Sequence, residues 1–348
     1  MTNILKQVLA ADVAKNELVV AFGRMSQDTS IDIFAYKTFS NNQKGFKGLL
    51  AWVMKLAVKE VKVRFVMEAT GVYHEKLAYY LTAQGHEVSI VLPNKISNYA
   101  KTLEIKTVTD KTASQAICQF GLERKLDIWE KPKEIFRTIK QLTRERDQLI
   151  AERTMIKNQL HAEKTEAYPN KDSILRMNKR IHLINQQEKE IRLAVTKVIK
   201  QDDELAAKID KISSIPGVGK LTAAIVMGET NGFELIRSKK QLINYAGMNV
   251  KEKQSGTSVK GKPKMSKKGN RHLRKAMHLP ALSAIRHDLR FKAVFVRLVS
   301  KHGIKMKAVV AVQKKILEMI YTLWKTDAEY DRNYLQKISQ HTQVCINN

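Results

Sequence analysis

The chain has few cysteines and no long apolar run. Its 348 residues include two cysteines, Cys118 and Cys345, which are too few and too far apart for a disulfide framework or a zinc site. No apolar run approaches the roughly 20 residues that cross a bilayer, and the first residues lack the apolar core of a signal peptide. We therefore expect a soluble protein of a reducing cytoplasm.

Acidic residues are also scarce relative to basic ones. The chain carries 34 Asp and Glu against 62 Lys and Arg, a formal charge of +28, and its pI is about 9.9. This balance indicates a polyanion binder, and nucleic acid is the first candidate. A ribosomal or histone-like protein could share the charge but would seldom be this long. The length and a hydrophobic content of 43% predict two or three domains with real cores.

Residues 1–130 alternate β-type runs with helical stretches. Strands are predicted in QVLAADVA, ELVVAFG, DIFAYKTF, KVRFVME and EVSIVLP, because apolar and β-branched residues cluster there. Three successive strands followed by alternating helix and strand favour a mixed sheet that opens with an antiparallel meander. This is the order of an α/β fold of the RNase H or RuvC type.

Residues 131–211 carry an apolar repeat with alternating steps of three and four, interrupted by a polar break at 168–170. This period predicts an antiparallel coiled-coil hairpin. Arg146 or Arg153 could face Glu188 across its seam. A rigid spacer and a dimerisation arm are both consistent with the pattern.

Residues 212–325 are predicted to be mainly helical and basic. Gly217 and Gly219 form a tight turn before a helix that starts near Lys220. Such a turn resembles a helix-hairpin-helix element, whose exposed amides can grip a DNA phosphate. An ordinary glycine turn between helices is the alternative. Further helices are predicted at 270–288 and 304–324, and residues 326–348 form a polar tail.

Three carboxylates follow predicted strands in the first domain. Asp12 lies in the first strand, Glu68 ends the strand before Ala-Thr-Gly, and Asp110 begins a predicted helix as its N-cap. Carboxylates that converge from such positions can hold Mg²⁺ for phosphoryl transfer. Taken singly, each has a structural alternative: a turn, a pairing with lysine, or a helix cap.

The segment from Lys251 to Lys275 holds ten Lys or Arg and one Glu. Its charge predicts a phosphate-binding loop, kept flexible by glycines. A solvated surface loop is the alternative. The predicted phosphate contacts are Lys267, Lys268, Asn270, Arg271 and Arg274.

Six segments resemble the DEDD-type insertion-sequence transposases, a family related to the Piv DNA invertase. They occur in the family's order and spacing over nearly the whole chain: AADVAKNELVVA, MEATGVYHEKLAYYL, VLPNKISNYAKTLEIKTVTDKTASQAICQFG, IPGVGKLTAAIV, YAGMNVKEKQSG and MSKKGNRHLRKAMHLPALSA.

The resemblance implies a RuvC-like N-terminal domain whose acidic residues bind Mg²⁺. Asp12, Glu68 and Asp110 match the first three members of the acidic tetrad. It also implies that Ser255, in Gln-Ser-Gly, attacks a DNA phosphodiester and forms a transient phosphoseryl link. A serine hydroxyl needs activation, so the metal must come near Ser255 in the assembled complex.

The fourth acidic position departs from the family pattern. It lies three residues after Asp110, where this chain has Ala113. Either three carboxylates suffice, or Thr112 or Ser114 helps through water, or this copy is impaired.

In the family, a structured bridge RNA pairs with target and donor DNA, so the resemblance implies donor DNA, target DNA and a guide RNA as partners. Recombination across four strands implies a homodimer or homotetramer. The setting would be the nucleoid of a bacterial or archaeal cytoplasm.

Two functions of other classes remain open. A RuvC-like structure-specific endonuclease would need the carboxylates but not Ser255. A catalytically impaired nucleic-acid-binding protein would need neither, and Ala113 would then mark the loss of the metal site.

Overall fold

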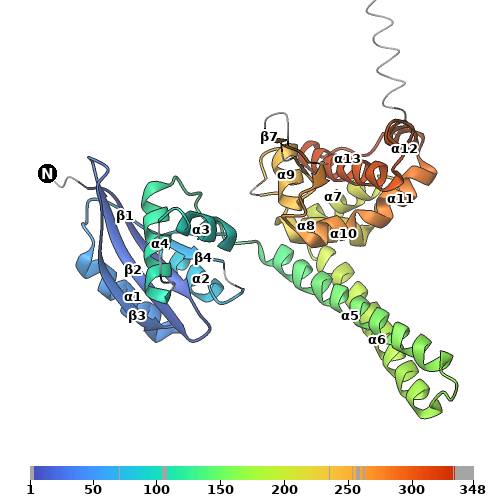
Figure 1. Cartoon of the computed structure of the whole chain (residues 1–348), viewed down its shortest axis with the longest axis horizontal. Helices are drawn as coiled ribbons and strands as arrows, with labels where there is room; N and C mark the ends of the chain where they lie inside the picture. The colour runs from blue at the N-terminus through green and yellow to red at the C-terminus, as the bar shows by residue number, and fades with distance from the viewer. Residues whose placement is uncertain are drawn as a thin grey trace, which may run out of the picture. The chain divides into compact units, whose positions relative to one another are not determined.

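The computed structural model describes residues 4–69, 71–103, 107, 109–234, 236–252, 254–255, 259–261, 263–331 and 333. The chain forms two compact units, Met1–Lys131 and Pro132–Asn348 (Figure 1). No helix in the described part of the chain is both long and apolar enough to cross a membrane. Cys345 and most of the predicted polar tail lie outside the described residues.

The first unit contains a five-stranded mixed sheet in the order β3-β2-β1-β4-β5. The antiparallel meander that the sequence predicts is confirmed, since β1 pairs with β2 and β2 with β3 in antiparallel register. β4 is parallel to β1 and to β5. The strands are β1 (Ile4–Val13), β2 (Glu17–Ser26), β3 (Ile31–Ser40), β4 (Val63–Glu68) and β5 (Glu87–Val91).

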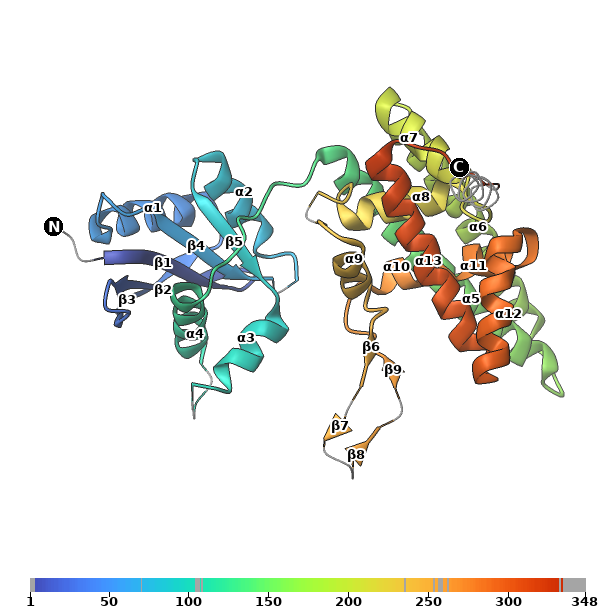
Figure 2. The same cartoon turned by 90° about the horizontal axis from the view of Figure 1, so that it is seen from above.

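Helices cover both faces of this sheet. Figure 2 shows α1 and α2 on one side and α3 and α4 on the other. Side chains alternate along a strand, so Leu9 and Ala11 of β1 pack in the core under α1 and α2, whereas Val8 and Ala10 pack in the core under α4. The bounds are α1 (Gln43–Leu56), α2 (Glu75–Ala83), α3 (Pro93–Ala100) and α4 (Asp110–Glu123).

The second unit begins with two long helices that pack on each other, α5 (Glu134–Thr165) and α6 (Lys171–Ile199). A small core of Ile156, Met177 and Ile184 joins them. The predicted charge contact between the helices is confirmed, and both arginines make it: Arg146 and Arg153 each donate to Glu188.

The apolar repeat does not continue as one helix to residue 211. Asp202, which occupies one of the repeat positions, instead caps a separate helix α7 (Asp203–Ser213) by accepting a hydrogen bond from the Leu205 amide at 2.9 Å. A cap side chain satisfies backbone N–H groups that have no partner within the helix. Leu205 itself packs in the core of the part of the second unit that follows α6, which we call the helical domain.

The helical domain surrounds one large apolar core. The sequence prediction missed α9 and α12, and the predicted helix at 270–288 is two helices separated near Met277. The remaining helices are α8 (Lys220–Thr230), α9 (Lys239–Ala246), α10 (Arg271–Ala276), α11 (His278–His287), α12 (Leu289–His302) and α13 (Lys305–Thr326).

Part of the basic segment is a two-stranded ribbon rather than an irregular loop. β6 (Val250–Lys251) pairs antiparallel with β9 (Lys264–Met265), and β7 (Gln254–Ser255) pairs antiparallel with β8 (Val259–Lys260). Figure 2 shows β6 and β9 beside α9, with β7 and β8 farther from the helices. We call the strands β6 to β9 together the cationic ribbon.

Candidate functional site

The three predicted carboxylates of the first unit share one face and one edge of the sheet. Asp12 alternates with Val8 and Ala10, so it lies on the face covered by α4. By the same alternation Glu68 follows Val66 on that face. Both residues lie at the carboxyl ends of the parallel strands β1 and β4, while Asp110 opens α4, which packs across β1 and β2.

The electrostatics agree with this placement. The pKa of Asp12 is raised by burial first, and then by the negative charges of Asp110 and Glu68. The carboxylates are therefore near enough to repel one another, and a bound cation would relieve this repulsion.

Asp110 does not cap α4, contrary to the sequence prediction. The cap is Thr109, whose hydroxyl accepts from the Thr112 amide at 3.2 Å and completes a capping box with the Thr112 hydroxyl. Thr109 has an extended backbone and precedes the first helical residue. It therefore provides the capping side chain that the sequence analysis assigned to Asp110. The Asp110 side chain lies exposed in the first helical turn.

The hydroxyls considered as replacements for the fourth carboxylate are engaged in local backbone contacts. Thr112 donates to the carbonyls of Thr107 and Thr109. Ser114 is fully buried and donates to the Lys111 carbonyl at 2.8 Å. Within the described helix α4, the surroundings of Ala113 thus give no substitute ligand.

The fit of a divalent cation is mixed. The donor atoms are carboxylate oxygens, which Mg²⁺ prefers, and their mutual repulsion suits a cation. However, among the described residues no group of three or more His, Cys, Asp or Glu side chains is assembled as a metal site. The feature that favours a cation here is therefore the negative charge that Glu68 and Asp110 place near Asp12.

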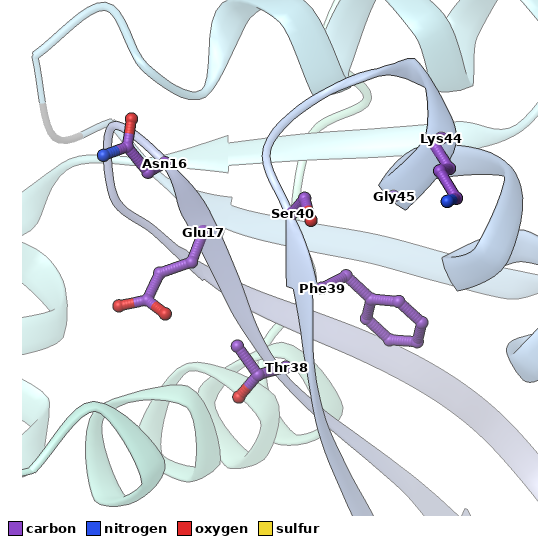
Figure 3. Close-up of a pocket in the computed structure, with 7 residues that line it drawn as sticks. All are labelled: Asn16, Glu17, Thr38, Phe39, Ser40, Lys44 and Gly45. Atoms are coloured by element: carbon purple, nitrogen blue, oxygen red, sulfur yellow. The ribbon is translucent and has the colours of Figure 1, made fainter.

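An open pocket of about 540 Å³ lies at the turn between β1 and β2 and the end of β3 (Figure 3). Glu17 and Lys44 project on opposite sides of Ser40. The pocket lining contains none of the predicted site residues. Its mixed charge does not identify a ligand.

Ser255 lies in β7 of the cationic ribbon, where its backbone pairs with Val259. Its side chain is outside what the structure describes. The predicted nucleophile is therefore placed by its backbone alone, on a short ribbon that extends from the helical domain.

The predicted phosphate contacts differ in their surroundings. Lys267, Lys268 and Arg271 are exposed. Arg274 instead donates to the carbonyls of Ala246 at 2.7 Å and Gly269 at 3.1 Å, so part of its guanidinium is used inside the protein.

The Asn270 side chain makes hydrogen bonds within the protein. Its side-chain oxygen accepts from the His272 and Leu273 amides and caps α10, and its amide nitrogen donates to Glu229 at 2.6 Å. The sequence analysis predicts Asn270 as a phosphate contact, which these bonds do not test, and it did not identify Glu229. The sequence feature that could have identified Glu229 is a carboxylate in an otherwise apolar helical stretch, AAIVMGET, because a buried carboxylate needs a partner.

The glycine turn before α8 is present. Gly217 has φ +86°, and a Cβ there would lie 2.5 Å from the Pro280 carbonyl oxygen, so this position requires glycine. Gly219 precedes α8 with open space beside it. Lys220 forms an exposed ion pair with Asp210 at 2.6 Å.

Comparison with known proteins identifies the family. A transposase family model of the DEDD type matches residues 9–169, and the transposase IS116/IS110/IS902 family model matches residues 209–295. The pilin gene-inverting protein of Moraxella lacunata is 29% identical over 94% of this chain and 98% of its own length. The corresponding protein of Moraxella bovis is 28% identical over the same shares.

A RuvC structure from Thermus thermophilus also matches, with 9% identity over 35% of this chain and 99% of RuvC. The TM-score of this match is 0.28. The two family models and the relatives, which align along almost the whole length, give the assignment independently of that match. The chain belongs to the DEDD-type IS110 family of transposases, and it is a DNA recombinase.

Proposed function

We propose that this protein cuts and rejoins DNA with Ser255 as nucleophile and Asp12, Glu68 and Asp110 as the acidic site that acts on the same phosphate. The observation that carries the proposal is the convergence of these carboxylates on one face and one edge of the sheet, with mutual repulsion around Asp12. The names of the Moraxella relatives, which refer to gene inversion, support a DNA rearrangement.

In the proposed reaction the Ser255 oxygen forms a bond to phosphorus and one bridging P–O bond to deoxyribose breaks. The freed sugar hydroxyl takes up a proton, and the serine hydroxyl gives one up. Attack of a second sugar hydroxyl on the phosphoserine then joins the new strands and restores Ser255. Two successive exchanges of this kind conserve the phosphodiester energy.

Asp12, Glu68 and Asp110 would hold Mg²⁺, which supplies positive charge for the phosphate oxygens when bound. The carboxylates contribute by accepting the ion together, since three negative charges at one sheet edge are costly without it. The cationic ribbon and the exposed Lys267, Lys268 and Arg271 bind the DNA backbone by charge.

Four finer features belong to this proposal. A structured guide RNA, encoded beside the gene, would pair with donor and target DNA while the protein reads backbone shape and charge. The turn at Gly217 and Gly219 would act as a helix-hairpin-helix phosphate grip. The α5 and α6 pair would be a coiled-coil arm that joins subunits into a dimer or tetramer. The site of action would be the nucleoid.

The test uses the full chain with Mg²⁺, the transcript of the sequence that flanks its gene, and labelled duplexes that span both junctions of that segment. A covalent protein–DNA adduct on denaturing gels and a joined product are expected. Ser255→Ala should abolish both, and Ser258→Ala in the same segment is the matched control. Omitting the transcript should remove activity.

Other results would overturn the proposal. Strand cleavage that persists without an adduct in Ser255→Ala would identify a structure-specific endonuclease. DNA binding without cleavage, unchanged by Asp12→Ala and Glu68→Ala, would identify a nucleic-acid-binding protein.

A further inference from the structure

A buried carboxylate contacts the two chain segments that flank the cationic ribbon. The Glu229 side chain is fully buried at the end of α8. It accepts two hydrogen bonds from Arg144 of α5, at 2.7 and 3.0 Å, and one from the side-chain amide of Asn270 at 2.6 Å. Its own backbone carbonyl accepts from the Tyr245 hydroxyl at 2.9 Å. One residue thus contacts α5, α9 and the segment that follows the ribbon.

The carboxylate is held in its charged form. Burial acts to raise the pKa of Glu229, but the hydrogen bonds from Arg144 and Asn270 outweigh it, and the pKa lies below its usual value. A charged, fully hydrogen-bonded side chain resists rearrangement because each alternative leaves a buried charge without partners.

Glu229 reaches the ribbon through Asn270. The Asn270 backbone amide donates to the Tyr245 carbonyl at 2.7 Å, and the Lys267 amide donates to the Gly247 carbonyl at 3.1 Å. Residues 245–247 precede the ribbon and residues 267–270 follow it, so these bonds join its two ends where they meet the helices.

A second set of contacts joins α5 to α10, which follows Asn270. Asp147, one turn after Arg144 on α5, accepts from His272 and from Lys275 of α10, each at 2.9 Å. The base of the ribbon is therefore tied to α5 at two points. A solvated basic loop would need no such buried or ion-paired contacts with α5.

We propose that Glu229 is a positioning residue for the strand-cleavage reaction: through Asn270 it fixes the base of the cationic ribbon and so the place of β7, which carries Ser255. The inference rests on the proposed role of Ser255 and adds a residue that does not touch DNA. Misplacing a reacting group by about 1 Å can cost on the order of 100-fold in rate, so the position of a two-residue strand on a ribbon matters to catalysis.

The test compares Glu229→Gln with Glu188→Gln in the full chain. Both changes neutralise a carboxylate that is paired with arginines of α5, but the partners of Glu188 belong to the pairing of α5 with α6. The junction duplexes described above serve as substrate, together with the flanking transcript. Three quantities are measured well below the unfolding temperature: the dissociation constant for DNA, the rate of adduct formation at saturating DNA, and hydrogen exchange of residues 245–252 and 264–270.

For Glu229→Gln we expect a DNA dissociation constant within about twofold of wild type, an adduct rate lowered about 10- to 100-fold, and faster exchange at both ends of the ribbon. Glu188→Gln should leave the adduct rate and this exchange unchanged. In combination with Asn270→Ala, Glu229→Gln should lower the rate little further than either change alone, since residues in one network are not additive.

Three results would overturn the inference: a wild-type adduct rate in Glu229→Gln, an equal loss in Glu188→Gln, or a rate loss without faster exchange at the ribbon. Its failure is distinguishable from failure of the proposed function, because only the latter predicts strand cleavage that persists without an adduct in Ser255→Ala, or DNA binding without any cleavage.

Discussion

Replacing Gly269 by alanine tests the close backbone contact at the base of the cationic ribbon. Gly269 has φ +150°, and a Cβ there would lie 2.4 Å from the Tyr245 carbonyl oxygen and 2.6 Å from the Gly247 nitrogen. Both are backbone atoms that cannot rotate away. Gly303, at the end of α12, offers a matched control, because it also has positive φ, +68°, but no atom of the described residues lies within 4 Å of the position that a Cβ would take there.

The two substitutions separate strain from steric conflict. A non-glycine residue at positive φ costs about 1–2 kcal/mol, and this is the whole cost expected for Gly303→Ala. Gly269→Ala adds overpacking against fixed atoms, about 1–3 kcal/mol. The total cost is therefore about 2–5 kcal/mol. A cost of this size raises the equilibrium constant for local opening of the ribbon base about 30-fold or more over wild type.

Hydrogen exchange is the appropriate assay, because the ribbon base can open locally without global unfolding. Gly269→Ala should accelerate exchange of residues 264–270 by about 30-fold or more, and the adduct rate should fall with it. If Gly269→Ala accelerated exchange at the ribbon base no more than Gly303→Ala accelerates exchange at the end of α12, the close contact of Gly269 with residues 245–247 would be refuted.

Two further predictions concern acidic positions. Ala113→Asp adds a carboxylate one turn after Asp110 on α4, so cleavage should reach half its maximal rate at lower Mg²⁺; an unchanged Mg²⁺ dependence would mean that three carboxylates suffice. For Asp147, burial acts to raise the pKa, but hydrogen bonds from Lys275 and His272 outweigh it, and the pKa lies below its usual value. Because the folded pKa is the lower one, this stabilisation is present above the unfolded pKa and is lost as pH falls through the folded pKa. The denaturation midpoint of wild type should therefore fall more steeply than that of Asp147→Asn below about pH 4, and parallel curves would contradict this.

The sheet and its acidic edge could be predicted from sequence because strand periodicity carries the necessary information. Alternation assigns Asp12 and Glu68 to one face once the apolar partners of each strand are known. The parallel pairing of β1 with β4 then brings their ends to the same edge. The cap of α4 was assigned to the wrong residue, since Thr109 and Asp110 are both favourable cap residues and only the backbone conformation decides between them.

The second unit was less predictable for a physical reason. The contact of Arg146 and Arg153 with Glu188 followed from a repeat that sets which positions face the neighbouring helix. The pairing of Arg144 with Glu229 joins residues 85 positions apart on helices without a shared repeat. No local period encodes such a contact, so the support of the ribbon became visible only in three dimensions.

The distribution of charge in this region links stability to function. The segment from Lys251 to Lys275 concentrates positive charge, and like charges destabilise a compact chain by self-repulsion. Glu229 and Asp147 place two negative charges at the base of the same region, where they hold Asn270, His272 and Lys275. The acidic residues thus anchor the segment inside the protein, while Lys267, Lys268 and Arg271 stay exposed for phosphates. Neutralising Glu229 or Asp147 should consequently change the position of the ribbon more than it changes the affinity for DNA.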